Sequence, residues 1–308
     1  MRELGPREFE REASAFDEAV AATPGVDAFC SSSDWVLSAR KAWGGRALFL
    51  TGASGLLAFR RDPSRLSGLD AMWDFACPIA APAPPELLAE FASRAARWAR
   101  VEFPGVVPNA ATFHAVVRAF DGRARLLVGR PQARVRASLE GGLAGFLARR
   151  TAKFRKGLRE AERRAARAGV EVVVGDGDLA RIAAVERRSW KGAAGEGLLH
   201  PQLTPFYRAL LPRLEARGAL RVRFARRAGE DLAYIAGGVR GATYRGLQFG
   251  FDRDHARLGL GNLLQRDQIA ALVDEGVRTY DLGIELPYKR RWGEERFVTV
   301  TLAACRAS

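Results

Sequence analysis

The sequence predicts an α/β protein with two tandem domains, each a mixed, mostly antiparallel sheet flanked by helices. Two observations support this prediction. In the second half, alternating apolar strands lead through a glycine-rich turn into an amphipathic helix and then into another strand. The first half repeats this order of elements without sequence identity, and 308 residues suffice for two domains of about 150 residues each. We place these domains at residues 1–135 and 136–308.

The elements of the first half follow from periodicity, turn residues and capping residues. Its expected helices cover residues 7–21, 33–43, 85–99 and 110–120. Its expected strands cover residues 47–51, 56–60, 72–77, 106–107 and 125–129. Ser33 or Asp34 is a suitable N-cap for the second helix, and Pro85 opens the third helix at its first turn.

A linker is expected over residues 131–142, and a long amphipathic helix begins at Leu143. We interpret the basic stripe on this helix as a solvated face, with contact to an acidic ligand as the alternative. The stripe consists of Arg149, Lys153, Lys156, Arg163 and Arg167. Further helices are expected at residues 179–190, 206–214 and 287–292, and one that ends at Gly276. Strands are expected at residues 170–174, 220–224, 232–239, 243–251, 277–282 and 297–302, and short turns join the second, third and fourth into an antiparallel meander.

The most informative segment is the turn that follows the strand ending at Phe251. It contains residues 252–257 and then the glycine-rich run Gly259-Leu260-Gly261-Asn262. Glycines let bare backbone N–H groups approach a phosphate, and the N-terminus of a helix favours negative charge. The turn therefore predicts a pyrophosphate-binding site, although a tight loop without a ligand can have the same pattern.

The corresponding loop of the first half has a different composition. It contains Pro78, Pro82, Pro84 and Pro85 ahead of its helix. Because proline has no N–H group to donate to a phosphate, we infer that only the second domain binds such a ligand. The first domain would then form one wall of an acceptor groove, or serve for packing alone.

The element order resembles the GNAT superfamily of acyl-CoA N-acyltransferases, over roughly Val170 to Leu302. In that fold, the strand before the turn and the strand after its helix splay apart, and the pantetheine arm enters between them. The GNAT turn has the pattern Gln/Arg-x-x-Gly-x-Gly/Ala. Gly259 and Gly261 fit this pattern, whereas Ala256 stands at the Gln/Arg position.

Three separate stretches add a more specific resemblance: residues 154–159, Glu186-x-x-Ser189-Trp190-Lys191, and Tyr288-Lys289-x-x-Trp292. Together they are similar to the cellulose-biosynthesis-type acetyltransferases, a GNAT branch related to the Fem peptidyltransferases of cell-wall synthesis. The resemblance implies twin GNAT-like domains, the first degenerate and the second catalytic. It also implies acetyl-CoA or another acyl-CoA as co-substrate, and no metal.

Direct acyl transfer to an amine needs a polarised thioester carbonyl, a proton acceptor, and a proton donor for the thiolate. The candidate catalytic residues are Glu186, Asp281 and Glu285 as bases and Tyr288 as the proton donor. The candidate acyl-CoA contacts are Arg257, Leu258, Gly259, Leu260, Gly261, Asn262, Leu263 and Lys289. The candidate acceptor contacts are Trp190, His200, Tyr207, Gln248 and Asp252. Each acid could equally be a surface or helix-capping residue, Trp190 a core residue, and His200 a loop residue with satisfied hydrogen bonds.

The composition limits the class of protein. Cys30, Cys77 and Cys305 form no CxxC pair, so we expect neither a disulfide framework nor a zinc site. We expect a cytoplasmic location and no membrane span, because no signal peptide and no apolar run of about 18 residues is present. The formal net charge of +14 favours an acidic partner. The abundance of Arg and Ala over Lys is also typical of GC-rich coding, and we do not expect nucleic acid as the partner.

The sequence thus predicts an acyl-CoA-dependent N-acyltransferase that acts on a small-molecule or peptide amine in a ternary complex. One alternative is a Fem-like aminoacyltransferase that uses aminoacyl-tRNA, although no long helical hairpin of the kind found in many of those enzymes is evident. The other is a catalytically inactive GNAT-like pair that binds nucleic acid through its arginines.

Overall fold

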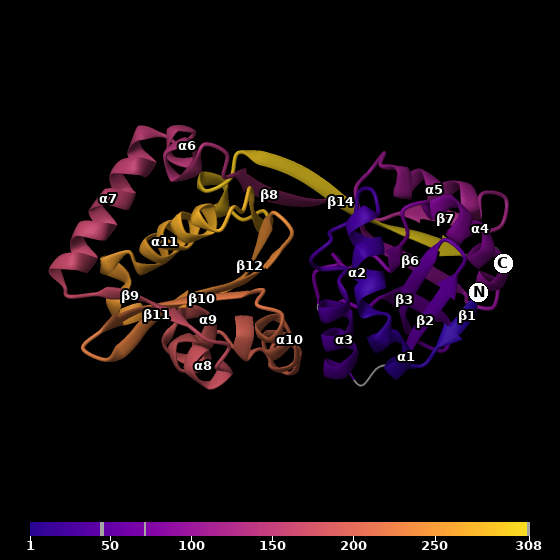
Figure 1. The fold of residues 1–308 in the computed structure, drawn as a ribbon, viewed down its shortest axis with the longest axis horizontal. Helices are drawn as coiled ribbons and strands as arrows, with labels where there is room; N and C mark the ends of the chain where they lie inside the picture. The colour runs from indigo at the N-terminus through magenta and orange to yellow at the C-terminus, as the bar shows by residue number, and fades with distance from the viewer. Residues whose placement is uncertain (44–45, 71, 307–308) are drawn as a thin grey trace. The chain divides into compact units, whose positions relative to one another are not determined.

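The computed structural model describes residues 1–43, 46–70 and 72–306, which form two compact units (Figure 1). Unit 1 comprises Met1–Ala133 and Val298–Ser308, and unit 2 comprises Arg134–Phe297. The chain passes from unit 1 to unit 2 between residues 133 and 134, two residues before the domain boundary expected between residues 135 and 136. The segment that begins at Val298 was expected in the second domain. It belongs to unit 1 instead, where its strand pairs with two strands of that unit.

Unit 1 has one mixed sheet with helices packed against it. Its helices are α1 (Pro6–Arg11), α2 (Ala13–Ala22), α3 (Ser33–Ala42), α4 (Pro84–Ala95) and α5 (Ala111–Phe120). Its strands are β1 (Arg2–Leu4), β2 (Ala47–Gly52), β3 (Gly55–Arg61), β4 (Arg65–Gly68), β5 (Ile79–Ala80), β6 (Arg100–Val106), β7 (Arg125–Val128) and the end of β14 (Glu295–Cys305). The sheet order is β1-β2-β3-β4-β6-β14, with β5 on β3 and β7 on β14. Its core includes a cluster of stacked and edge-on rings from Phe59, Phe91, Phe103 and Phe120.

Unit 2 repeats this plan. Its helices are α6 (Gly142–Ala148), α7 (Ala152–Arg167), α8 (Leu179–Arg188), α9 (Trp190–Ala193), α10 (Thr204–Ala216) and α11 (Leu260–Asp274), with short 3-10 turns η1 (Gly197–Leu199), η2 (Arg253–Leu258) and η3 (Lys289–Arg291). Its strands are β8 (Gln132–Ser138), β9 (Glu171–Gly175), β10 (Leu220–Arg227), β11 (Glu230–Arg240), β12 (Thr243–Phe251) and β13 (Thr279–Ile284). The sheet order is β8-β13-β12-β11-β10-β9, antiparallel except for the β12–β13 pair.

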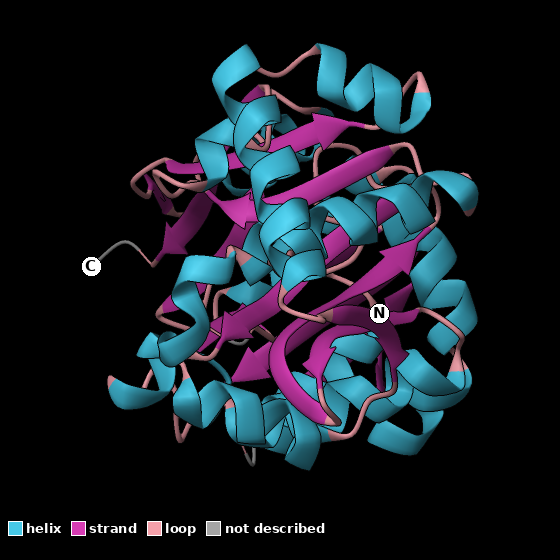
Figure 2. Cartoon of the chain, turned by 90° about the vertical axis from the view of Figure 1, so that its left-hand side faces the viewer, coloured by secondary structure: helices cyan, strands magenta, loops and turns pink. Residues whose placement is uncertain are grey.

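Helices cover both faces of the unit 2 sheet (Figures 1 and 2). The core on the α11 side joins Phe146 of α6, Leu158 of α7 and Ile269 of α11. Helices α8, α9 and α10 lie on the other side of β10 and β11. Within the described residues, no helix is both long and apolar enough to cross a lipid bilayer.

The two units have the same strand topology, which confirms the predicted fold class. In each, helices connect the first two strands of the meander: α1–α3 join β1 to β2, and α8–α10 join β9 to β10. In each, one helix then lies between two strands that pair in parallel, α4 between β4 and β6, and α11 between β12 and β13. In each, a sixth strand, β14 or β8, pairs antiparallel with the second parallel strand.

Two predictions for the region between the halves are wrong. The expected linker at residues 131–142 contains β8, which pairs with β13 from Ser138 to Arg134. The expected single helix from Leu143 is interrupted between α6 and α7. Thr151 caps α7, where its hydroxyl accepts a hydrogen bond from the N–H of Phe154 at 3.2 Å, so the helix restarts there.

Three predictions within unit 1 also need correction. Residues 72–77 are not a strand, because the carboxylate of Asp70 accepts the backbone N–H groups of Phe75 and Ala76. The N-cap of α3 is Ser32, one residue before the expected range, and its hydroxyl accepts from the N–H of Trp35. The expected helix over residues 7–21 is broken at Glu12, which ends α1 and precedes α2.

Candidate active site

The central feature of unit 2 is a divergence of its two parallel strands. β12 pairs with β13 only from Thr243 to Arg245, opposite Thr279 to Asp281. Beyond that point β12 follows β11 to Phe251, whereas β13 continues along β8. We call this divergence the strand split, defined by residues 246–251 on β12 and 282–284 on β13. The two strands that flank the glycine turn and its helix therefore splay, as the resemblance implied.

The glycine turn closes the far end of β12. Gly259 is in the left-handed region, with φ of 72°, and is the N-cap of α11. The N–H groups of Asn262 and Leu263 donate to the carbonyl of Gly259. In the part of the chain that the structure describes, the N–H groups of Leu260 and Gly261 have no acceptor. These two donors of the first helical turn are what an anion can bind.

The surroundings of this turn come from α7 and from β12. A Cβ atom at Gly259 would lie 3.0 Å from Cβ of Ala161 and 3.2 Å from the guanidinium of Arg164, both on α7. At Gly261, a Cβ atom would lie 3.2 Å from the ring of Phe249. The remaining predicted acyl-CoA contacts of the turn differ in exposure: Arg257 and Asn262 are exposed, Leu258 and Leu263 are half-buried, and the Leu260 side chain is buried.

Asp281 stands where the strands part. Its Oδ2 accepts hydrogen bonds from Arg134 of β8 at 2.9 Å and from Arg245 of β12 at 2.8 Å. Its Oδ1 accepts from the N–H of Gly283 at 2.7 Å, within a bulge where Gly283 has φ of 73°. The three charged side chains are buried, so this ion cluster joins β8, β12 and β13 at the vertex of the strand split.

The segment after the split supplies a half-buried tyrosine, Tyr288, and a half-buried lysine, Lys289. The ammonium of Lys289 donates to the carbonyl of Leu282 at 2.6 Å. Burial, followed by repulsion from nearby cations, lowers the pKa of Lys289 to about 8. Tyr288 lies beside Phe249, with ring centroids 5.7 Å apart, and burial raises the pKa of its hydroxyl to about 12. Tyr288 therefore keeps its proton at neutral pH.

Glu186 of α8 forms a second buried cluster. Its carboxylate accepts from the Tyr234 hydroxyl and pairs with the ammonium of Lys191, each at 3.0 Å, and also accepts from the N–H of Leu198. Glu186 is fully buried. A Cβ atom at Gly250 would lie 2.5 Å from Oε2 of Glu186, so the backbone of β12 presses against this carboxylate.

A short chain of hydrogen bonds extends from this cluster to two of the predicted acceptor contacts. The Lys191 ammonium donates to Oε1 of Gln248 at 2.8 Å, and the Gln248 amide donates to the Tyr207 hydroxyl at 3.1 Å. Burial lowers the pKa of Lys191, while burial and the charge of Glu186 raise that of Tyr234. Gln248 lies on the diverging part of β12, so this series of hydrogen bonds passes through the strand split and ends at Tyr207 of α10.

The other predicted site residues lie outside these two clusters. Glu285 pairs with Arg290 at 2.6 Å and with Arg296. Asp252 pairs with Arg188 at 2.8 Å and caps η2. The side chain of Trp190 is exposed, and Nδ1 of His200 accepts the N–H of Gln202 in the loop before α10.

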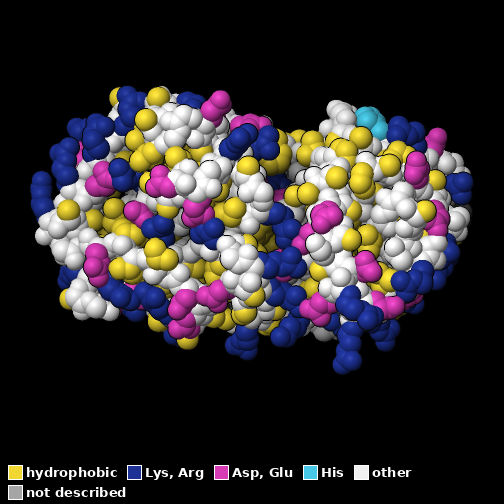
Figure 3. All heavy atoms as spheres, in the orientation of Figure 1, with side chains coloured by type: hydrophobic (Ala, Val, Ile, Leu, Met, Phe, Trp, Pro, Cys, Tyr) yellow, Lys and Arg dark blue, Asp and Glu magenta, His cyan; other side chains and the backbone are white. Residues whose placement is uncertain are grey.

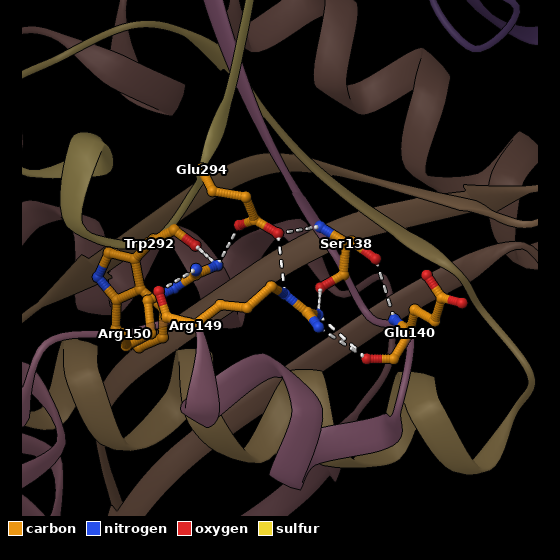
Figure 4. A network of polar contacts seen from close by, with 6 residues as sticks. All are labelled: Ser138, Glu140, Arg149, Arg150, Trp292 and Glu294. Carbon is orange, nitrogen blue, oxygen red and sulfur yellow. Dashed lines mark hydrogen bonds and ion pairs between the residues drawn. The ribbon is translucent and has the colours of Figure 1, made fainter.

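A network of polar contacts fixes the segment that carries Tyr288 and Lys289 (Figure 4). Glu294 accepts hydrogen bonds from Arg149, from Arg150 and from the N–H of Ser138 in β8. Arg150 also donates to the carbonyl of Trp292 at 2.6 Å. The ring of Trp292 packs on Phe146 and Phe154. Arg149 and Arg150, which lie at the break between α6 and α7, thus hold the end of this segment against β8.

Sequence reasoning assigned no site role to four residues of the two clusters: Arg134, Lys191, Tyr234 and Arg245. Arg245 could have been found, because it lies on an alternating strand opposite the predicted site residue Asp281. Arg134 gave no such signal, since β8 itself was interpreted as a linker. The stretches at 154–159, 186–191 and 288–292 do meet in space: Phe154 packs on Trp292, and Lys191 lies close enough to Lys289 to lower its pKa.

Residues 152–290 match the family model described as "Acetyltransferase (GNAT) domain". This part of the chain is therefore similar to GNAT domains. It contains the glycine turn, the strand split, the Glu186 cluster, and Asp281 and Arg245 of the other cluster, whereas Arg134 precedes it.

Solved structures share the fold of the whole chain. FemX superposes with a TM-score of 0.66 at 11% identity, over 97% of each chain. A protein of unknown function from Bacteroides thetaiotaomicron VPI-5482 superposes with a TM-score of 0.67 at 14% identity, over 96% of this chain and 97% of that one. A tandem GNAT protein from the clavulanic acid biosynthesis pathway gives 0.51 at 14% identity, over 99% and 98%. At these identities the likeness concerns the fold alone, which this chain shares with FemX and with the tandem GNAT protein. No curated protein matches the sequence.

Proposed function

We propose that the protein is an N-acyltransferase that takes its acyl group from acyl-CoA, with acetyl-CoA as the first donor to test. The observation that carries this proposal is the strand split together with α11. The free N–H groups of Leu260 and Gly261 are suited to the pyrophosphate of CoA, and the pantetheine arm is proposed to run between the diverging strands toward Asp281.

The equivalent helix of unit 1 supports binding in the second unit alone. α4 occupies the same place in its unit as α11 does in unit 2, and its first two helical residues are Pro84 and Pro85. The equivalent positions of α11 are Leu260 and Gly261. Proline has no N–H, so α4 lacks the two donors that α11 offers. We therefore propose one acyl-CoA per chain.

The proposed reaction is a direct transfer within a ternary complex. The acceptor amine attacks the thioester carbon, and the carbonyl oxygen is stabilised by a backbone N–H on the diverging part of β12. The C–S bond then breaks, and the thiolate takes a proton. Tyr288 is suited to give that proton, because it is protonated at neutral pH and lies beside β12 through Phe249.

The acceptor ammonium must also lose a proton, and three acids are the candidate bases. Glu186, Asp281 and Glu285 are each already paired with a cation. Glu186→Gln, Asp281→Asn and Glu285→Gln should therefore be compared for turnover and for CoA affinity. Loss of the base lowers turnover much more than CoA affinity, because the base acts on the acceptor. If all three variants keep full turnover across pH, the proton goes to water.

A pair of variants at one position tests the CoA site. Gly261→Ala keeps the backbone N–H, and its Cβ meets only side-chain ring atoms, of Phe249 at 3.2 Å and of Phe251 at 3.7 Å. Gly261→Pro removes that N–H. By isothermal titration calorimetry, we expect the alanine variant to bind CoA within about threefold of the wild type and the proline variant at least about tenfold more weakly. Equal CoA affinity in the two variants would contradict the assignment of this turn.

Turnover is measured as free thiol released from acetyl-CoA in the presence of a panel of amines. The alternative donor, aminoacyl-tRNA, is tested in parallel by thermal shift. Stabilisation by charged tRNA, with none by acetyl-CoA or longer acyl-CoAs, would replace the proposed donor. It would leave the fold and the GNAT assignment unchanged.

A further inference from the structure

Lys289 is a half-buried ammonium group without a carboxylate partner among the described residues. Across residues 1–43, 46–70 and 72–306, its hydrogen-bond partner is the Leu282 carbonyl, and it forms no ion pair. Removing an ammonium group from water is costly unless an anion compensates its charge. A carbonyl oxygen accepts a hydrogen bond but carries no net charge, so it compensates the ammonium charge only in part. The surroundings of Lys289 therefore favour an additional anion.

The charged groups around Lys289 increase this need. Those that shift its pKa are Arg245 on β12, Arg134 on β8, Lys191 on α9 and Asp281 on β13. Three of these four are cations. The carboxylate of Asp281 is already bound by both arginines, and Lys191 is held by Glu186. Burial and the three cations together outweigh Asp281, which is why the pKa of Lys289 falls to about 8.

The position of Lys289 separates it from the CoA phosphates. Its ammonium is held at Leu282, one residue beyond the last β12–β13 pair, at the vertex of the strand split. The glycine turn follows the other end of β12, after Phe251. Six residues of strand span about 20 Å, so the cation lies where the acyl end of the donor and the acceptor would meet.

We propose that Lys289 binds an oxyanion group of the acyl acceptor, so that the acceptor is an amine with a carboxylate or a phosphate-type group a few bonds from its nitrogen. This proposal rests on the proposed function for the location of the acceptor. The bound oxyanion supplies the missing negative charge, and Lys191, which reaches Gln248 at the split, adds a second cation nearby. A neutral amine would leave Lys289 uncompensated.

Three product-like ligands that differ in one group test the proposal by calorimetry. N-acetylglycine carries a carboxylate, N-acetylaminomethylphosphonate carries a phosphonate, and N-acetylglycinamide is neutral. We expect at least one charged ligand to bind at least tenfold more tightly than the amide. The better charged ligand tells which oxyanion the acceptor carries. Equal affinity for all three, or no binding by either charged ligand, overturns the proposal.

Proton uptake gives a second readout that does not depend on turnover. An anion beside Lys289 raises its pKa, so at pH 8 binding should take up a fraction of a proton per site, and at pH 6.5 close to none. Titrations in two buffers of different ionisation enthalpy measure this uptake. Absence of uptake at pH 8 by a ligand that shows the charge preference would place the anion away from Lys289 and overturn the assignment.

Variants complete the test. Lys289→Met should abolish both the charge preference and the uptake, whereas Lys289→Arg should keep the preference without the uptake, because arginine does not titrate in this range. Lys156→Met, at an exposed position of α7, is the matched control and should behave as the wild type. A charge preference that survives in Lys289→Met overturns the proposal. Acetyl-CoA binding by the wild type is measured separately, so failure of the proposed donor is distinguished from failure of the oxyanion site.

Discussion

The replacement Asp281→Asn should destabilise unit 2 more than any exposed ion-pair change. In the wild type, Oδ2 of Asp281 accepts from Arg134 at 2.9 Å and from Arg245 at 2.8 Å. The exposed fractions of these three residues are only 8%, 2% and 4%. Asparagine has the same shape but no charge, and its NH₂ group can face a guanidinium that also only donates.

The size of the effect follows from these contacts. Each hydrogen bond between charged groups contributes about 1.5–3 kcal/mol, and the bond from the Gly283 N–H to the side-chain oxygen can survive in the amide. Breaking a buried ion pair by removing one partner costs about 3–5 kcal/mol, because the other charge stays buried. We therefore expect the free energy of unfolding to fall by about 3–5 kcal/mol.

Denaturant unfolding at pH 7, followed by circular dichroism, measures this difference. The matched control is Asp267→Asn, which breaks a more exposed pair with Arg223, and which should cost at most about 1 kcal/mol. If Asp281→Asn costs no more than Asp267→Asn, the cluster at the vertex of the strand split does not hold the three strands together, and the reasoning is refuted.

Three further predictions concern the turn, Lys289 and the charge of the chain. Gly259→Ala should lower the free energy of unfolding by about 1–2 kcal/mol, because alanine is strained at φ of 72° and its Cβ would crowd Ala161; unchanged thermal unfolding would contradict this. Lys289→Met should raise the free energy of unfolding by about 1–3 kcal/mol at pH 7, since each pKa unit corresponds to about 1.36 kcal/mol and the lysine pKa falls from 10.5 to about 8 on folding. That gain should shrink by pH 9.5, because the folded wild type loses this proton above about pH 8 while the unfolded chain keeps it; a gain independent of pH would count against the buried charge. Lys and Arg side chains lie over both units with Asp and Glu among them, so fluorescence anisotropy should detect no submicromolar binding of tRNA or DNA at physiological salt; such binding would favour the nucleic-acid alternatives (Figure 3).

Periodicity and turn residues predicted most of unit 2, because the relevant signals are local. The meander of β10, β11 and β12 alternates apolar residues and turns at Gly229 and Gly241, so its strands are evident from short windows. The glycine turn and α11 follow from Gly259 and the apolar face that contains Ile269. In these segments, the local pattern of apolar residues and glycines favours the same strands, turns and helix that the structure contains.

The missed features depend on partners that are distant in sequence. β8 carries Arg134 at a buried position, where local patterns lead one to expect an apolar residue, and the partner that makes this acceptable is Asp281. The break after Arg149 lies in a helix-favouring run, and it is stabilised by Glu294. The sequence therefore suggested Asp281 and Lys289 as candidates, but it could not show that the acids are paired and that the lysine lacks a carboxylate.

The interrupted course of unit 1 has a consequence for the order of events at the ribosome. The C-terminal part of β14 lies between β6 and β7, and it leaves the ribosome roughly 170 residues after β7. At about 5–20 residues per second, this is a delay of roughly 10–30 s. During that time β6 and β7 have exposed edges that can pair with other chains. The nascent first unit should therefore depend on chaperones until the second unit and the last strand have been translated.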